Sequence, residues 1–278
     1  MKYEIRELSI GEVLDQAIKV IMDNLAPLIL IAFLLQGPLA LFSIIGTTFV
    51  FKFNPNANDP AALQVMTPAF GMFLAFIGLF NLLIIAPLTN AAMVHAIADA
   101  YLGKKLTVGG SFSKAVSRML PLLGTWLLVF LATFAGTLFC IIPGILCMLW
   151  FVLATQVVVL ERKAGMAAME RSRELMRGNT LKWIVLLLVL IVIAVGLSIA
   201  AAVLGRLTGQ FVVRQTLASI SQIFMQIVTG AVLVIFYFSA RCTNENFDLE
   251  RLALSFSDDV ESGDSMYYDE DDDDIDLI

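Results

Sequence analysis

The chain has 278 residues, of which 59% are apolar and only 15% are charged, and its mean hydropathy is +0.86. A soluble domain carries roughly 45–50% apolar and about 25% charged residues. The interior of a water-soluble fold of this size would be too small to hide so much apolar surface. The composition therefore excludes a soluble enzyme and predicts an integral membrane protein. The net charge of −6 discourages binding to nucleic acid, which we do not expect as a partner.

Five runs without Asp, Glu, Lys or Arg locate the predicted membrane spans, because one span needs about 20 apolar residues. They hold 28, 39, 42, 23 and 26 residues. The longest run, 119–160, contains Pro143-Gly144 at its middle, and this turn signal predicts a tight helical hairpin. The run at 60–98 contains Pro87 and is either one long kinked helix or two short ones.

The distribution of Lys and Arg decides between these alternatives. Six spans place 15 basic residues on one side of the membrane and 3 on the other, whereas splitting the second span gives 13 and 5. We therefore expect an all-α, polytopic membrane helical bundle of six transmembrane helices with both termini cytoplasmic. The predicted spans cover about 25–51, 69–98, 121–141, 144–160, 181–205 and 215–240.

A short amphipathic stretch precedes three of the spans, and the first two such stretches begin alike, with LSIGE at 8–12 and LTVGG at 106–110. The recurrence predicts a pseudo-threefold repeat of one cytoplasmic-side interfacial helix followed by two spans. The repeats cover 8–100, 106–160 and 164–240. The interfacial helices are expected at about 9–23, 110–119 and 164–178.

The first interfacial helix has a clear start signal. Ser9 and Glu12 have the spacing of a capping box, and Leu8 and Val13 that of a hydrophobic staple. At helical spacing, one face of this helix is expected to be apolar and the opposite face, with Gln16, to be polar. The expected apolar face comprises Val13, Leu14, Ala17, Ile18 and Ile21.

The third interfacial helix is expected to bury Ala168, Met169, Ser172, Leu175 and Met176. Helices of this kind lie in the membrane interface with their apolar faces toward the lipid. Its cations Arg171, Arg173 and Arg177 are candidates for contact with the anionic cytoplasmic leaflet. These helices either anchor and connect the spans or sense lipid headgroups and dock a partner.

Polar residues within the spans are the first candidates for a functional site. The second span holds Asn81, Asn90 and His95, with Asp99 at its end. His95 and Asp99 share a helix face and form either a proton relay or an ordinary interfacial pair. Because no second carboxylate lies within any span, a carboxylate pair for acid–base chemistry is missing.

The last span has a stripe in which Ala218, Gln222, Gln226 and Gly230 recur every four residues. Gln side chains hydrogen-bond across helices in membranes, and small residues permit close approach. A similar stripe of small residues in the fifth span comprises Ala194, Ser198 and Ala202. Both stripes serve either helix packing or the lining of a polar pathway.

We expect neither catalytic residues nor a cofactor nor a metal site. The chain has one histidine and three scattered cysteines, and the common serine-nucleophile, phosphate-loop and zinc-protease motifs are absent. Cys140 and Cys147 flank the expected turn at Pro143-Gly144, where a disulfide between them is one alternative.

The tail at 241–278 has a different composition, with 14 acidic and 2 basic residues. It is expected to be disordered and cytoplasmic. Three roles are open: a docking peptide for a protein partner, an acidic segment that interacts with the basic cytoplasmic loops, or a solvated tail without a specific contact. Without it, 16 basic and 10 acidic residues give the first 240 residues a net charge of +6. This membrane part suits an anionic leaflet.

Five segments follow one another in an order that resembles a known family. They are 9–15 (SIGEVLD), 121–124 (PLLG), 142–145 (IPGI), 157–161 (VVVLE) and 168–178 (AMERSRELMRG). The chain resembles the bacterial membrane domain attached to some glycerophosphoryl diester phosphodiesterases, a family that includes stand-alone, YciC-like inner-membrane proteins. In active members a separate soluble barrel holds the catalytic residues. We carry over no phosphodiesterase activity, because no such barrel lies in these residues, and the acidic tail departs from the family pattern.

These observations favour a non-catalytic protein of the bacterial inner membrane that organises or senses membrane lipid, with the lipid bilayer as its partner. The alternative is a transporter or channel for a small solute or a lipid, which Asn81, Asn90, Gln222 and Gln226 favour.

Overall fold

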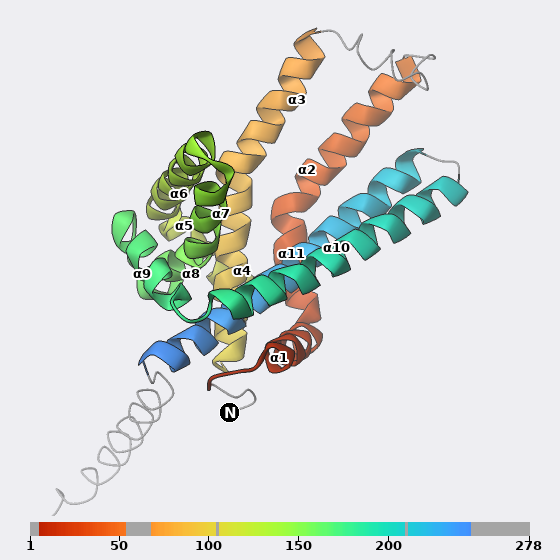
Figure 1. Ribbon diagram of the computed structural model, residues 1–278. Coiled ribbons are helices and arrows are strands. Elements are labelled where there is room, and N and C mark those ends of the chain that lie inside the picture. Colours follow the sequence, from red (N-terminus) through yellow and green to blue (C-terminus); the bar gives the residue numbers. More distant parts are fainter. Residues whose placement is uncertain (1–5, 54–67, 104–105, 209–210, 246–278) are drawn as a thin grey trace, which may run out of the picture.

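The computed structural model describes residues 6–53, 68–103, 106–208 and 211–245, and these residues are helical with no strand (Figure 1). The predicted tail at 241–278 begins within the last helix and lies outside the described residues from 246 onward. The helices are α1 (Ile10–Asp23), α2 (Leu25–Phe53), α3 (Pro68–Phe80), α4 (Ala86–Tyr101), α5 (Val108–Ser117), α6 (Met119–Phe139), α7 (Ile141–Trp150), α8 (Ala154–Gln156), α9 (Met166–Met176), α10 (Thr180–Leu207) and α11 (Phe211–Glu245).

Six segments of the described chain are long and apolar enough to cross a membrane, which confirms the predicted all-α bundle. All six contain a window of high mean hydropathy with few charges. They are Leu25–Gly46, Ala75–Tyr101, Met119–Phe139, Ile141–Glu161, Thr180–Leu207 and Val212–Glu245.

The second span is one continuous helix, because a π-helical turn at Asn81–Ile85 joins α3 to α4. The N–H of Ala86 donates to the carbonyl of Asn81, five residues earlier. Pro87 follows directly and has no N–H to donate. The wider turn absorbs this loss without breaking the helix.

The hairpin in the longest apolar run turns at Cys140, three residues before the predicted Pro143-Gly144 turn. Cys140 is extended, with φ −169° and ψ 150°, and α7 begins at Ile141. Pro143 therefore lies in the first helical turn, where a missing N–H costs nothing. Gly144 serves close approach instead, since a Cβ there would lie 2.9 Å from Cα of Thr137.

The fourth span is interrupted at Phe151–Leu153, between α7 and α8. Ser172 of α9 satisfies the backbone groups at this break: its Oγ accepts from the N–H of Leu153 at 3.2 Å and donates to the carbonyl of Trp150 at 2.7 Å. Within a membrane such a break needs partners from the protein, because no water is there to replace them.

Each surface helix packs against the second span of the preceding repeat. Thus α5 contacts α4, α9 contacts α7, α8 and the π-helical turn after α8, and α1 returns to contact α11. The contact between a surface helix and the second span of the repeat before it therefore occurs three times, and the contact of α1 with α11 joins the last repeat to the first. The apolar faces of these helices therefore pack on neighbouring repeats. From the sequence we expected these faces to contact lipid.

The faces of the two helices fit the prediction to different degrees. In α9 the buried residues are the five that were predicted. In α1 the buried face is rotated: Gln16 and Val20 are buried, whereas Ile18 is 54% exposed. Gln16 lies inside because its Oε1 accepts a hydrogen bond from the hydroxyl of Tyr101 at 2.8 Å. The capping box at Ser9 and Glu12 is present as predicted.

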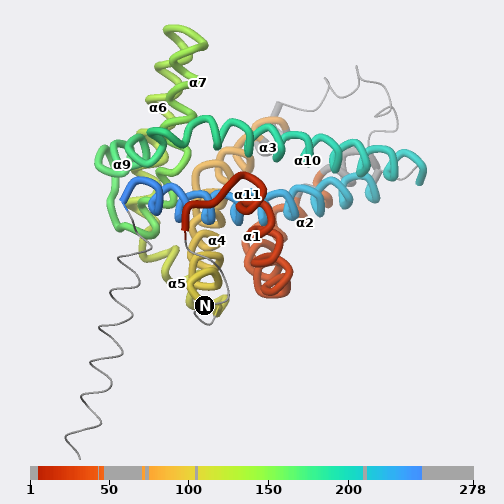
Figure 2. The backbone as a smooth tube through the Cα atoms, turned by 60° about the horizontal axis from the view of Figure 1, so that its bottom comes forward, coloured from red at the N-terminus to blue at the C-terminus, as the bar shows by residue number. Residues whose placement is uncertain are grey.

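Buried side chains gather at one end of the bundle, which we call the base. The base comprises α1, α5 and α9 with the adjoining parts of the six spans, such as the start of α2 and the last half of α11. The far parts of the hairpins, called the arms, have mostly exposed apolar side chains. Figures 1 and 2 show the α6–α7 and α10–α11 arms leaving the base in different directions.

Candidate intramembrane binding site

Where the arms leave the base, side-chain amides from four segments of the chain line one cavity. Its volume is about 570 Å³, and its walls come from α2, α4, α8, α10 and α11. The amide side chains in its wall are Gln36, Asn90, Gln156, Gln222 and Gln226. Thr155 and Thr229 add hydroxyl groups.

Two further cavities adjoin the first through shared residues. One, of about 510 Å³, lies between α10 and α11, and one of about 160 Å³ lies between α2, α11 and the π-helical turn that carries Asn81. Gln222 lines all three cavities. We call the three together the amide site.

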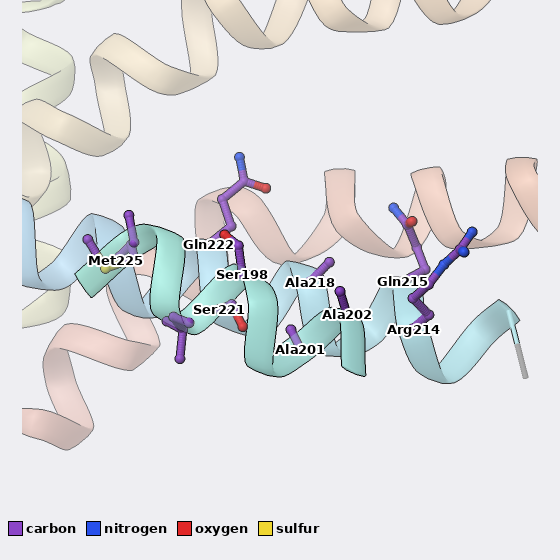
Figure 3. Close-up of a pocket in the computed structure, with 11 residues that line it drawn as sticks. Ser198, Ala201, Ala202, Arg214, Gln215, Ala218, Ser221, Gln222 and Met225 are labelled. Carbon is purple, nitrogen blue, oxygen red and sulfur yellow. The ribbon is translucent and has the colours of Figure 1, made fainter. Parts of the chain in front are cut away.

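The cavity between α10 and α11 is lined mainly by small side chains. Figure 3 shows Ser198, Ala201 and Ala202 from α10 along it, with Arg214 and Gln215 near one end and Gln222 nearer the other. The helices approach each other closely beyond this cavity, where a Cβ on Gly205 would lie 2.8 Å from Cα of Arg214. Of the two predicted stripes, Ala194, Ser198, Ala202, Ala218 and Gln222 line this cavity.

Two of the amides lie near the middle of their spans. Gln36 follows the start of α2 by 11 residues and Asn90 precedes the end of α4 by 11 residues. At 1.5 Å per residue each lies about 16 Å along the helix from that end. Polar groups within apolar spans are costly and mark functional sites. Asn90 and Gln222 are exposed, so the site is open to the surroundings of the protein.

The amides are only partly satisfied within the protein. Gln226 donates from Nε2 to Oδ1 of Asn90 at 3.4 Å. Within the described part of the chain, the buried atoms Oε1 of Gln226 and Oδ1 of Asn81 have no hydrogen-bond partner. A buried acceptor without a donor costs about 1–3 kcal/mol. The protein therefore leaves part of the hydrogen-bonding capacity of these amides unused.

Four of the sequence candidates, Asn81, Asn90, Gln222 and Gln226, are brought together by the fold. Sequence reasoning missed the other three amides, Gln36, Gln156 and Gln215. All three had a usable signal, because each lies inside a charge-free run.

His95 and Asp99 lie outside the amide site, and the structure does not pair them with each other. Oδ2 of Asp99 accepts from Nζ of Lys114 on α5 at 2.7 Å. Nε2 of His95 is buried and has no hydrogen-bond partner among the described residues. The expected His–Asp pair is therefore replaced by an ion pair between α4 and α5.

Arg171 was expected to contact lipid headgroups, but in the structure it lies in an ion-pair network inside the base. Its Nε donates to both carboxylate oxygens of Glu161, at 3.2 and 2.9 Å, and its side chain also pairs with Glu245. The hydroxyl of Tyr237 donates to Glu161 at 2.9 Å. Partial burial acts to lower the pKa of Arg171, but its hydrogen bonds to Glu161 and Glu245 raise it overall.

The other two cations of α9, Arg173 and Arg177, are exposed. The guanidinium of Arg173 lies 4.5 Å from the ring centre of Trp150, a cation–π arrangement. Arg177 lies at the end of α9, just before Gly178, whose φ is +78°.

Cys140 and Cys147 are free thiols in this structure. Because the hairpin turns at Cys140, both cysteines belong to the second helix of the hairpin, with Cys140 at the N-cap of α7 and Cys147 within α7. They are seven residues apart, which is about 10 Å along the helix. A disulfide needs Cα atoms within about 7 Å. Among the described residues, no group of three or more His, Cys, Asp or Glu side chains is placed to hold a metal ion.

The fold and the site together define an integral membrane protein with an amide-lined cavity between its helices. A family model described as "Domain of unknown function (DUF8558)" matches residues 139–277, half of the chain, and the chain belongs to this family. The matched part contains α10 and α11 with Gln215, Gln222 and Gln226. Searches of curated proteins and of solved structures gave no match.

Proposed function

We propose that this chain is a non-catalytic, multi-pass protein that binds a membrane lipid in the amide site and in this way organises or senses the lipid of its membrane. The observation that carries the proposal is the position of Gln222, which lies within an apolar span and lines three adjoining cavities. A lipid reaches such a site sideways from the bilayer, along helices whose outer faces are apolar.

The proposed membrane is the bacterial inner membrane, with both termini cytoplasmic and the base facing the cytoplasmic leaflet. The resemblance to YciC-like inner-membrane proteins and the 15-to-3 distribution of basic residues support this orientation. Arg173 and Arg177 are the exposed cations of α9 that suit contact with anionic headgroups. Reporter fusions to residues 1 and 278 test the orientation, and an external signal from either end contradicts it.

The lipid is measured by mass spectrometry of the full chain after detergent extraction and washing. We expect lipid to remain with the wild type and to fall about fivefold when Gln222→Leu removes one hydrogen-bonding side chain. Thr216→Val is the matched control, because its hydroxyl bonds to the carbonyl of Val212 on its own helix, outside the amide site. Equal lipid in all three proteins contradicts the proposal.

A transporter or channel is the second candidate, and the continuity of the three cavities favours it. Flux of small solutes through proteoliposomes distinguishes the two functions. Solute flux in the wild type that Gln222→Leu and Asn81→Leu both change supports transport. Absent or unchanged flux removes it and leaves lipid binding in place.

A further inference from the structure

Resting on the proposed function, we propose that the lipid group held in the amide site is uncharged and carries hydroxyl groups, as in a diacylglycerol or a neutral glycolipid. Three observations lead to this class of ligand: the lack of ionisable groups in most of the lining, the amide side chains that the lining carries, and the position of the nearest cation.

The described lining of the amide site is almost free of ionisable groups. Arg214 is the one ionisable side chain among the described residues that line it, and it borders the cavity between α10 and α11 alone. Phosphate groups in proteins are usually held by Arg or Lys, which bind them through charge-assisted hydrogen bonds. Between apolar spans an anionic phosphate without such a partner is costly. The other two cavities are therefore poor sites for a phospholipid headgroup.

The amide side chains have the opposite preference. Each carries a carbonyl oxygen that accepts hydrogen bonds, and Gln222, which lines all three cavities, is exposed to them. A phosphodiester or a choline group has no donor to offer these oxygens. A hydroxyl both donates and accepts, so it forms a hydrogen bond with either the carbonyl oxygen or the NH2 group of a side-chain amide.

An ammonium group would also supply donors, but it would bring a positive charge. No carboxylate lies among the described lining residues to balance that charge. A hydroxyl satisfies the same acceptors without any charge to desolvate. The volume of the cavity that Gln226 lines, about 570 Å³, suits a small headgroup of this kind.

The test is a competition measured by native mass spectrometry on the full chain, with lipids of identical acyl chains. The lipids are diacylglycerol, monoglucosyl diacylglycerol, phosphatidylcholine, phosphatidylethanolamine and phosphatidic acid. We expect the two hydroxyl lipids to bind more tightly than the phospholipids, by about fivefold for each hydrogen bond that a hydroxyl donates to a lining amide. Diacylglycerol, with one hydroxyl, is therefore expected to gain about fivefold, and the glucosyl lipid, with several hydroxyls, to gain more.

The variants isolate the amide contribution. Gln226→Leu is expected to reduce the preference for hydroxyl lipids about fivefold, and Thr216→Val to leave it unchanged. If Gln226→Leu does not give a monodisperse protein, Gln222→Leu takes its place, since Gln222 is exposed and its replacement leaves the core intact. A preference that both leucine variants retain in full overturns the assignment to the amides.

Each remaining outcome has a separate meaning. Tighter binding of phosphatidic acid or phosphatidylethanolamine overturns the uncharged-hydroxyl assignment while lipid binding itself stands. Binding of no lipid at all overturns the proposed function. Displacement of the bound lipid by a 100-fold excess of free glycerol or glucose overturns the lipid assignment. It would identify a small hydroxylated solute as the ligand of the amide site.

Discussion

The base and the arms of this protein differ in composition and in how they are held together: the surface helices α1, α5 and α9 of the base are amphipathic, whereas α6, α7 and α10 are apolar on nearly every face. In the base, polar contacts link residues far apart in sequence, such as the N–H of Leu8 with Oγ of Ser239 at 3.0 Å. The arms mostly present exposed side chains, such as Phe134 and Leu138 on α6. Lipid is as apolar as these side chains, so burying them against protein gains little. Specific hydrogen bonds and close packing therefore decide where the helices converge, and the amide site lies at the boundary.

The largest expected contrast between the two regions comes from the same substitution made in each. Phe236 is 2% exposed in the base and packs on Trp183 with ring centres 5.4 Å apart, whereas Phe134 in an arm is 57% exposed. Phe236→Ala is expected to cost about 3–5 kcal/mol because it leaves a cavity, and Phe134→Ala less than about 0.5 kcal/mol. Unfolding in detergent micelles measures both. Equal losses remove the distinction between base and arms.

The α6–α7 arm is an exception in which packing within one hairpin matters. A Cβ on Gly144 would lie 2.2 Å from Oγ1 and 2.9 Å from Cα of Thr137, so Gly144→Ala forces the helices apart and is expected to cost about 1–3 kcal/mol. Gly196→Ala in α10 is the control, because nothing lies within 4 Å of the added carbon. It is expected to stabilise its helix by up to about 1 kcal/mol. The free energy of unfolding measures both, and a neutral Gly144→Ala contradicts the close approach.

The ion-pair network of Arg171 is expected to contribute less than the aromatic core of the base. Arg171→Gln leaves Glu161 and Glu245 without their shared partner, which is expected to cost about 1–2 kcal/mol because the arginine side chain remains 14% exposed. Arg177→Gln, at an exposed position, is the control. The two variants are compared by chemical unfolding. If Arg177→Gln is the more destabilising variant, the network is not a stabilising part of the base.

The smallest effect concerns the start of α1. Hydrogen bonds from the backbone and side chain of Ser9, together with Arg6, lower the pKa of Glu12 from 4.5 to about 2. Because the folded-state pKa is lowered, the stabilisation is complete above about pH 4.5 and is lost as the pH falls toward about 2. Amide exchange in α1, corrected for the intrinsic rate, is expected to rise over this range. In Glu12→Gln the rise should vanish, and a rise of equal size there contradicts the role of the carboxylate.

Much of the fold follows from local sequence signals. Charge-free runs located the six spans, and the Ser9–Glu12 spacing located the start of α1. Two local signals were misleading. Pro143 and Gly144 indicate a turn on their own, but in a membrane hairpin they equally suit a helix start and a close contact. Gln16 is polar and was placed outward, because its partner Tyr101 lies 85 residues away.

The sequence by itself determined that this protein is a bundle of apolar helices with polar residues at Asn81, Asn90, Gln222 and Gln226, because length, charge and spacing are local properties. Only the tertiary structure decided that these residues face one another, that Gln36 and Gln156 join them, and that Arg171 lies inside an ion-pair network. These relations depend on how each helix is rotated about its axis. In a chain that is apolar on nearly every face, helix rotation is set by contacts between distant segments, which periodicity alone does not reveal.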